Sequence, residues 1–173
     1  MKKVLFLLLT AALLTGCGAQ ETFETVEDII PVQPVAAKQQ LFAQFPEDAA
    51  SAAFSNEENG ELYLSDGCTI TKQILPGGDL AETVMTVTGQ SKDNLQIMKT
   101  RQQGADRYDF VWAAAGEDGL QLGRACILDD GDYHYVLSAM AEESVAADLQ
   151  ETWEDLFSTC CLLDPDVNLN TGS

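Results

Sequence analysis

The clearest structural signal in the chain lies at residues 108–140, which read YDFVWAAAGEDGLQLGRACILDDGDYHYVLSAM. Asp130-Gly131 favours a two-residue hairpin loop, because a type I′ turn needs positive φ at both central positions. The segment 116–119, Gly-Glu-Asp-Gly, marks a four-residue loop. Apolar runs typical of β-strands lie around these loops. The pattern predicts three consecutive antiparallel strands, at residues 108–115, 120–128 and 133–140.

The two loops also fix which residues of these strands face each other. The predicted register sets large side chains against smaller ones, pairing Trp112 with Gly123, Phe110 with Ala125 and Tyr108 with Ile127. The reverse face is apolar as well, with Val111, Leu122, Cys126, Leu128, Tyr135 and Leu137. We therefore expect the sheet to be covered on both faces, at least in part.

Two charged residues lie within this predicted sheet. Asp109 and Arg124 are diagonal neighbours on the second apolar face. We expect them to form a partly buried ion pair with an architectural rather than a catalytic role.

Turn and cap signals organise the chain before this segment. Two strands are predicted at 62–65 and 68–75, joined across Asp66-Gly67. Asp79, followed by Glu82, resembles a capping box that opens a short helix. Gly89 ends that helix. Further strands are predicted at residues 94–101 and, ahead of Pro46, at residues 41–45.

The C-terminal part predicts a second amphipathic helix. Ser144 is a candidate N-cap, and apolar residues recur after it at helical spacing, at Val145, Leu149, Trp153, Leu156 and Cys160. The predicted fold class is α+β, an antiparallel sheet of six to seven strands with two main helices arranged as a sandwich.

This order of elements resembles the PsbP-like fold, which small nuclear-transport and bacterial envelope proteins share. The resemblance covers residues 41–162. It rests on the element order, the Gly-rich entry to the first helix at Pro76-Gly77-Gly78, and the run Tyr108–Trp112. It carries over no functional residue, and it implies an accessory or binding module rather than an enzyme.

The N-terminus is similar to the export signal of bacterial lipoproteins. Lys2 and Lys3 precede an apolar run at residues 4–14 that is too short to span a bilayer. The tetrapeptide Leu14-Thr15-Gly16-Cys17 resembles a lipobox. The resemblance implies cleavage before Cys17 and acyl chains such as palmitate attached at that residue. The domain would then face outward, anchored to the bacterial cell membrane. An ordinary signal peptide with an accidental cysteine is the alternative.

Four segments follow from these signals. Residues 1–16 are the predicted signal peptide, and 17–40 form an acidic, flexible tether of about 25 to 30 Å root-mean-square reach. A short docking element at Val26, Ile29 and Ile30 is the alternative for part of that tether. Residues 41–163 form one predicted globular domain, and residues 164–173 a disordered tail.

The chain is strongly acidic, with 28 Asp and Glu against 9 Lys and Arg and a formal net charge of −19. Removal of residues 1–16 takes away Lys2 and Lys3 but no acid, which changes −19 to −21. Such a surface repels nucleic acid, whose binding needs basic side chains. We expect no nucleic-acid partner. A solvated acidic coat explains the charge, while cationic partners and divalent metals stay open.

Besides Cys17, the chain has four cysteines, Cys68, Cys126, Cys160 and Cys161, and all are candidates for disulfides in an exported domain. Spacing does not select among the three full pairings. Cys126 and Cys160 also suit small buried core positions. No zinc site is predicted, because the chain has one histidine and no second Cys-x-x-Cys.

The search for catalytic groups is mostly negative. The predicted hairpin places His134, the single histidine, opposite Ile127, which favours a structural imidazole over a general base. Calcium binding is an alternative for two acidic groups, Asp129, Asp130 and Asp132 in one turn, and Asp164, Asp166, Asn168 and Asn170 in the tail. Turn chemistry and an acidic tail explain both groups, so no metal or other cofactor is expected.

These patterns predict a membrane-anchored lipoprotein that acts outside the cytoplasm as a binding or accessory module, not as an enzyme. Its partner would be an envelope protein or a small ligand. The alternatives are a cell-surface hydrolase that uses His134 and a calcium-binding envelope protein.

Overall fold

The computed structural model describes residues 37–52, 60–116 and 119–164. The predicted signal peptide, the lipobox cysteine, most of the predicted tether and residues 165–173 of the predicted tail lie outside these ranges. Within them, no helix combines the length and the apolar character needed to cross a bilayer.

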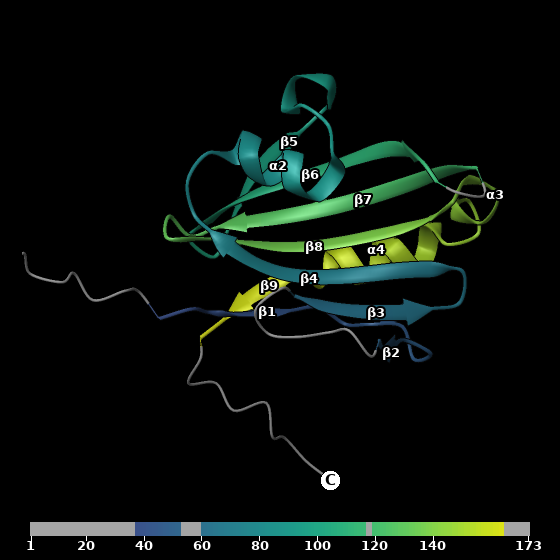
Figure 1. The fold of residues 1–173 in the computed structure, drawn as a ribbon. Helices are drawn as coiled ribbons and strands as arrows, with labels where there is room; N and C mark the ends of the chain where they lie inside the picture. Colours follow the sequence, from purple (N-terminus) through teal and green to yellow (C-terminus); the bar gives the residue numbers. More distant parts are fainter. Residues whose placement is uncertain (1–36, 53–59, 117–118, 165–173) are drawn as a thin grey trace, which may run out of the picture. The chain divides into compact units, whose positions relative to one another are not determined.

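An antiparallel sheet of seven strands forms the centre of the domain and confirms the predicted α+β class (Figure 1). Its strands, in sheet order, are β2 (Ala50–Ser51), β3 (Glu61–Ser65), β4 (Cys68–Pro76), β8 (Tyr133–Glu142), β7 (Leu120–Asp129), β6 (Ala105–Ala115) and β5 (Met98–Gln102). The three strands predicted from residues 108–140 are β6, β7 and β8.

A second, two-stranded sheet pairs β1 (Gln40–Phe42) with β9 (Cys161–Leu163). The strand predicted at 41–45 is therefore shorter than expected and lies outside the main sheet. This small sheet joins two segments that lie far apart in the sequence.

The first predicted helix is α2 (Leu80–Thr88), and its caps are confirmed. The Asp79 carboxylate accepts a 2.8 Å hydrogen bond from the Ala81 backbone N–H. Gly89 ends the helix with φ +70°, a conformation that glycine adopts without a Cβ penalty. A 3₁₀ turn, η1 (Lys92–Asn94), follows.

The single C-terminal helix predicted from Ser144 to Cys160 is wrong. The segment forms two short helices, α3 (Glu143–Ala146) and α4 (Gln150–Ser158). The Asp148 N–H bonds to the Val145 carbonyl, so the backbone tightens into a turn between them. Ser144 lies inside α3 rather than capping it, and Cys160 follows α4.

The register predicted for β6 and β7 is confirmed, including the pairing of Trp112 with Gly123 and of Phe110 with Ala125. A Cβ on Gly123 would overlap the Trp112 indole ring. Position 123 therefore needs glycine, because the Trp112 ring leaves no space for a side chain there.

The register predicted for β7 and β8 is wrong by two residues. Asp129 faces His134, and the central loop residues are Gly131 and Asp132. Gly131 has φ +98°, whereas Asp132 is not at positive φ, which excludes a type I′ turn. Two carboxylates favour this loop, because Asp129 accepts from the Gly131 N–H and Asp130 from the N–H groups of Asp132 and Tyr133.

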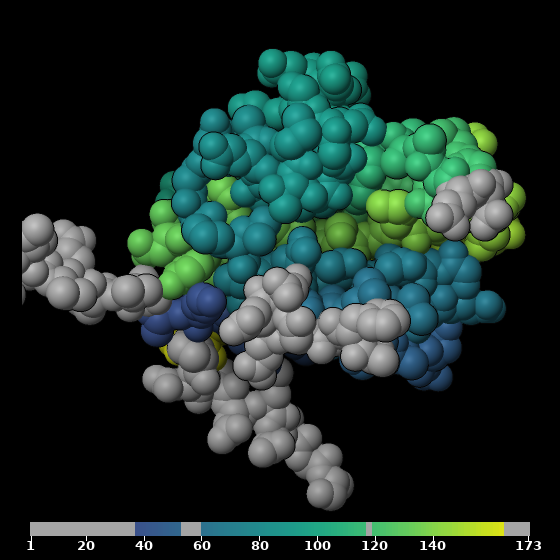
Figure 2. Space-filling view, viewed as in Figure 1, coloured from purple at the N-terminus to yellow at the C-terminus, as the bar shows by residue number. Residues whose placement is uncertain are grey.

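The two faces of the sheet bury separate apolar clusters, as predicted. One lies beneath α4, β1 and β9 and includes Leu128, Leu137, Trp153, Leu156 and Phe157. The other lies beneath α2 and comprises Val84, Phe110, Trp112, Ala125, Ile127 and Val136. Figure 1 shows α2 and α4 on opposite faces. In Figure 2 the teal segment around α2 covers only part of its face, and green atoms of the long strands stay visible beside it.

Candidate binding groove

The most distinctive surface of the domain follows from where β5 begins. A strand was predicted at 94–101, but β5 starts only at Met98, which pairs with Asp109 of β6. Residues 92–94 form the 3₁₀ turn instead, and Leu95 and Ile97 pack against the cluster beneath α2. Residues 110–115 of β6 therefore have no strand partner on this side among the described residues. We call this side of residues 110–115 the free edge of β6.

The hairpin loops at the two ends of β6 show which backbone groups point to the free edge. Gln103 and Gly104, with φ +51° and +92°, form the tight turn between β5 and β6, closed by the pair of Gln102 and Ala105. At the other end the Gly116 N–H donates to the Gly119 carbonyl, 2.7 Å. In an antiparallel strand, successive residues direct their N–H and C=O groups to alternate sides. Odd-numbered residues of β6 therefore point to β5 or to the free edge.

Within the described strand, three residues, Val111, Ala113 and Ala115, direct backbone groups to the free edge. Val111 directs its N–H and C=O there, and Ala113 directs its N–H there. The Ala113 carbonyl accepts a 2.5 Å hydrogen bond from the Gln90 side-chain amide, which agrees with this direction. The Val111 side chain is 65% exposed, unusually high for a valine in a long strand. The edge is thus able to accept a further extended backbone.

A groove of about 850 Å³ runs across this edge. Its lining comes from three places: the segment after α2 (Gln90, Asn94, Leu95), the edge of the sheet (Val111, Trp112, Ala113, Leu122, Gly123, Arg124) and the helices α3 and α4 (Glu143, Ala146, Ala147, Gln150, Trp153). The lining is mainly apolar, with a few polar groups, as is usual for binding sites.

The predicted ion pair between Asp109 and Arg124 is wrong. Asp109 instead pairs with Arg107, whose side chain lies on the same face of β6. Arg107 Nε is 2.7 Å from Asp109 Oδ2, and Arg107 Nη2 is 2.8 Å from Asp109 Oδ1. Arg124 lies over the Phe157 ring, 4.7 Å from its centroid, and lines the groove. Arg107 also donates to the carbonyls of Phe157 and Cys160 at the end of α4, and the Asp109 carboxylate is satisfied by Arg107 without Arg124.

The four predicted disulfide candidates fall in different places. Cys126 and Cys160 are fully buried in the same cluster, beneath α4. Cys68 is buried at the start of β4, and Cys161 is half-buried at the start of β9. Burial raises the pKa of the Cys68 and Cys161 thiols. All four are free thiols in this structure.

The His134 imidazole lies between a hydroxyl and a carboxylate. The sequence analysis did not predict these two neighbours. Its Nδ1 is 2.6 Å from Thr83 Oγ1, and its Nε2 is 3.6 Å from Asp129 Oδ2. Thr83 and His134 are 5% and 1% exposed. None of the five principal cavities of the described residues is lined by these groups. The burial of His134 favours its structural interpretation.

The Asp129 and Asp130 carboxylates in the acidic turn after β7 accept hydrogen bonds from backbone N–H groups of that turn. Besides the loop N–H groups, Asp130 accepts from the Tyr135 hydroxyl and from the Gln39 side chain. Within the described ranges, no group of three or more His, Cys, Asp or Glu residues is arranged to hold a metal ion. Of the tail group considered for calcium, Asp166, Asn168 and Asn170 lie outside the described residues.

Comparisons with solved structures show the same fold at low sequence identity. Cyanobacterial PsbP (CyanoP) from Synechocystis sp. PCC 6803 is 10% identical, with a TM-score of 0.51 over 87% of this chain and 99% of that one. LpqN of Mycobacterium tuberculosis is 13% identical, with a TM-score of 0.50 over 78% of this chain and 88% of that one. The resemblance to the PsbP-like fold is therefore confirmed at the level of fold.

A protein from Bacteroides thetaiotaomicron VPI-5482 is 12% identical, with a TM-score of 0.50 over 72% of this chain. This chain spans about half the length of that protein, 46%. No family model matches the sequence, and no curated protein matches it significantly.

Proposed function

We propose that this protein is a lipid-anchored lipoprotein of the bacterial cell envelope, and that its domain binds an extended segment of a partner protein along the free edge of β6. The observation that carries the proposal is the set of outward-directed backbone groups of Val111 and Ala113 inside an apolar groove. In strand addition, such groups provide affinity and the surrounding pockets provide specificity.

A peptide suits this groove better than a compact ligand. The unpaired groups repeat at the two-residue spacing of a strand, which matches the backbone of another strand. Val111, Leu122 and Trp153 supply apolar surface beside them, and Arg124 supplies a positive charge in an otherwise acidic protein. The groove volume also falls within the range of small-molecule sites, so a small apolar ligand is the second candidate.

The proposed location rests on the resemblance of Leu14–Cys17 to a lipobox. It agrees with the fold shared with LpqN, a protein described as involved in cell envelope biogenesis. A tether between lipid and domain would let the groove reach partners beyond the head groups.

The binding proposal is tested by photo-crosslinking in intact cells. A benzophenone side chain is placed at position 111, in the groove, or at position 64, where Leu64 is 53% exposed on β3 outside it. We expect a discrete protein adduct from position 111 and none of that mass from position 64. Equal adducts at both positions would exclude a site at the free edge. A small-molecule adduct confined to position 111 would show that the groove binds a small ligand and not a peptide.

The anchor is tested separately. We expect the mature wild type to carry acyl mass on its N-terminal peptide and to enter the detergent phase. Cys17→Ser should lose both properties. A wild type that stays in the aqueous phase with an unmodified Cys17 would leave an ordinary signal peptide as the correct interpretation.

A further inference from the structure

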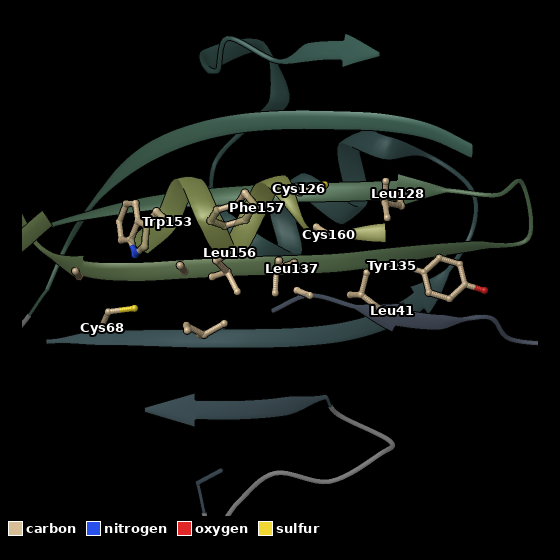
Figure 3. Close-up of a cluster of buried hydrophobic side chains, with 14 of the residues drawn as sticks. Leu41, Cys68, Cys126, Leu128, Tyr135, Leu137, Trp153, Leu156, Phe157 and Cys160 are labelled. Atoms are coloured by element: carbon tan, nitrogen blue, oxygen red, sulfur yellow. The ribbon is translucent and has the colours of Figure 1, made fainter. Parts of the chain in front are cut away.

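Two cysteines lie against each other in the cluster beneath α4. Cys126 stands in the middle of β7 and Cys160 directly follows the end of α4. Both side chains have zero exposure and belong to the same buried cluster, and an interaction between the two thiols shifts the pKa of each in opposite directions. Figure 3 shows both among the apolar side chains that surround Phe157 and Leu137.

The backbone around Cys160 is held in place by β5 and β6. Gln102 Nε2 and Arg107 donate to the Cys160 carbonyl at 3.2 and 3.3 Å. Arg107 also donates to the Phe157 carbonyl at 2.9 Å, while Asp109 holds its guanidinium. The neighbouring strand pair places Cys126 directly opposite Asp109. Two elements distant in sequence thus place Cys126 and Cys160 in the same buried cluster.

We propose that Cys126 and Cys160 form a disulfide in the exported protein, which links the end of α4 to β7. This inference rests on export, which belongs to the proposed function, but not on binding at the groove. The alternative pairing of Cys68 with Cys126 does not fit the fold. Cys68 faces Ala141 of β8 and Cys126 faces Leu137, so about 13 Å of strand separates those positions, whereas a disulfide needs Cα atoms within about 7 Å.

The oxidant is a disulfide of the thiol-exchange class, either a protein disulfide or oxidised glutathione. The Cys160 thiolate attacks one oxidant sulfur and forms a mixed disulfide, and one oxidant thiol leaves. The Cys126 thiolate then attacks the Cys160 sulfur and releases the second thiol. Two protein thiols become one disulfide, the oxidant disulfide becomes two thiols, and these take up the two protons.

In the folded domain the surroundings of the two thiols differ. The interaction with Cys126 lowers the pKa of Cys160, and the Arg107 guanidinium lowers it further, against the effect of burial. The same interaction, with burial, raises the pKa of Cys126. Because both sulfur atoms are buried in the folded domain, we expect the exchange to occur while the chain folds after export.

The test uses the full mature chain, recovered from the envelope without reductant and alkylated in denaturant. Peptide mapping should find Cys126 linked to Cys160, with Cys68 and Cys161 alkylated. Cys68→Ala is the matched buried control and should keep the link, whereas Cys126→Ala should leave Cys160 alkylated. Reduction of the wild type should lower Tm by roughly 10 °C.

A second sample separates failure of export from failure of the pairing. Reduced protein is unfolded and refolded in an oxidised and reduced glutathione mixture, which needs no export. The same Cys126–Cys160 link is expected. If both cysteines are alkylated in this sample, or if Cys160 links to Cys68 or Cys161, the pairing is wrong. A link formed here but absent from envelope material would overturn the claim for the exported protein.

Discussion

The two halves of β6 differ in the number of strands that pair with them. Residues 105–109 have strand partners on both sides, β5 and β7, and carry the partly buried Arg107–Asp109 pair that holds the end of α4. Residues 110–115 pair only with β7 among the described strands, and expose Val111 to solvent. One strand therefore combines an architectural half with a half that is open to a partner.

This difference separates stability from binding. In the paired half, side chains contact several elements at once, so their loss leaves buried polar groups without partners. In the free half, outward backbone groups and an exposed valine contribute little to the fold. Substitutions in the first half should unfold the protein, and those at the free edge should weaken binding alone.

The largest effect is expected from Arg107→Met. The substitution leaves the partly buried Asp109 carboxylate without its ion-pair partner, and the Phe157 carbonyl without its hydrogen bond from Arg107. We expect the free energy of unfolding to fall by about 3–5 kcal/mol. Urea denaturation measures it. Arg101→Ala, an exposed arginine on the neighbouring strand, is the control and should change stability by less than about 0.5 kcal/mol. Equal losses in the two variants would contradict the role given to the paired half.

Gly123→Ala should have the next largest effect, because its Cβ would overlap the Trp112 ring from the opposing strand. We expect a loss of about 1–3 kcal/mol by overpacking. Gly116→Ala is the matched control, since its Cβ meets the movable end of the Gln121 side chain. Combining Gly123→Ala with Trp112→Leu should recover part of the loss. A combined loss equal to the sum of the single losses would show that the two residues do not interact.

Ala113→Pro probes the backbone of the free edge. It removes the outward N–H of Ala113, and proline is tolerated at edge positions whose N–H faces outward. We expect the crosslink yield from position 111 to fall up to about tenfold, the equivalent of one hydrogen bond, about 0.5–1.5 kcal/mol. Ala113→Val keeps the N–H and should retain the yield. Similar yields from both variants, each with a melting temperature near wild type, would argue against strand addition.

The smallest change in stability is expected for Val111→Ser. The side chain is 65% exposed, so the free energy of unfolding should stay within about 0.5 kcal/mol of wild type. Capture of the adduct from a benzophenone at the neighbouring groove position 122 should nevertheless weaken severalfold. A large loss of stability would place Val111 in the core and remove the distinction between the halves.

The sequence predicted the long strands well because side-chain size and loop length act locally there. Trp112 needs a glycine opposite it, and a four-residue loop brings Gly123 to that place. The next hairpin was shifted by two residues because carboxylates, not glycine alone, selected its loop. The type I′ geometry occurs instead at Gln103-Gly104, where glutamine gives no such signal.

The groove was missed for a specific reason. A strand beginning at Asn94 would have placed that residue opposite Ala113 and covered the edge that is open in the structure. Ser91 instead accepts from the Asp93 N–H and caps a 3₁₀ turn. Such a local side-chain bond competes with the strand ladder, and apolar residues after it, such as Leu95, suit either arrangement. Ser91 was the residue in the sequence that could have predicted the 3₁₀ turn.

Arg107 was also missed, because its partners come from α4 and depend on how that helix ends. The periodicity that favoured one helix through Cys160 could not show that α4 ends at Ser158 and leaves the Phe157 and Cys160 carbonyls to Arg107. Tertiary contacts of this kind override a helical pattern in the sequence.

Residue-resolved amide hydrogen exchange of the free mature protein tests most directly whether β6 is open beyond Asp109. The amides of Val111 and Ala113 should exchange roughly tenfold or more faster than those of Ala105, Arg107 and Asp109, which face β5. Equally slow exchange along the whole outer side of β6 would mean that another segment covers it, and the free edge would not exist as a binding site.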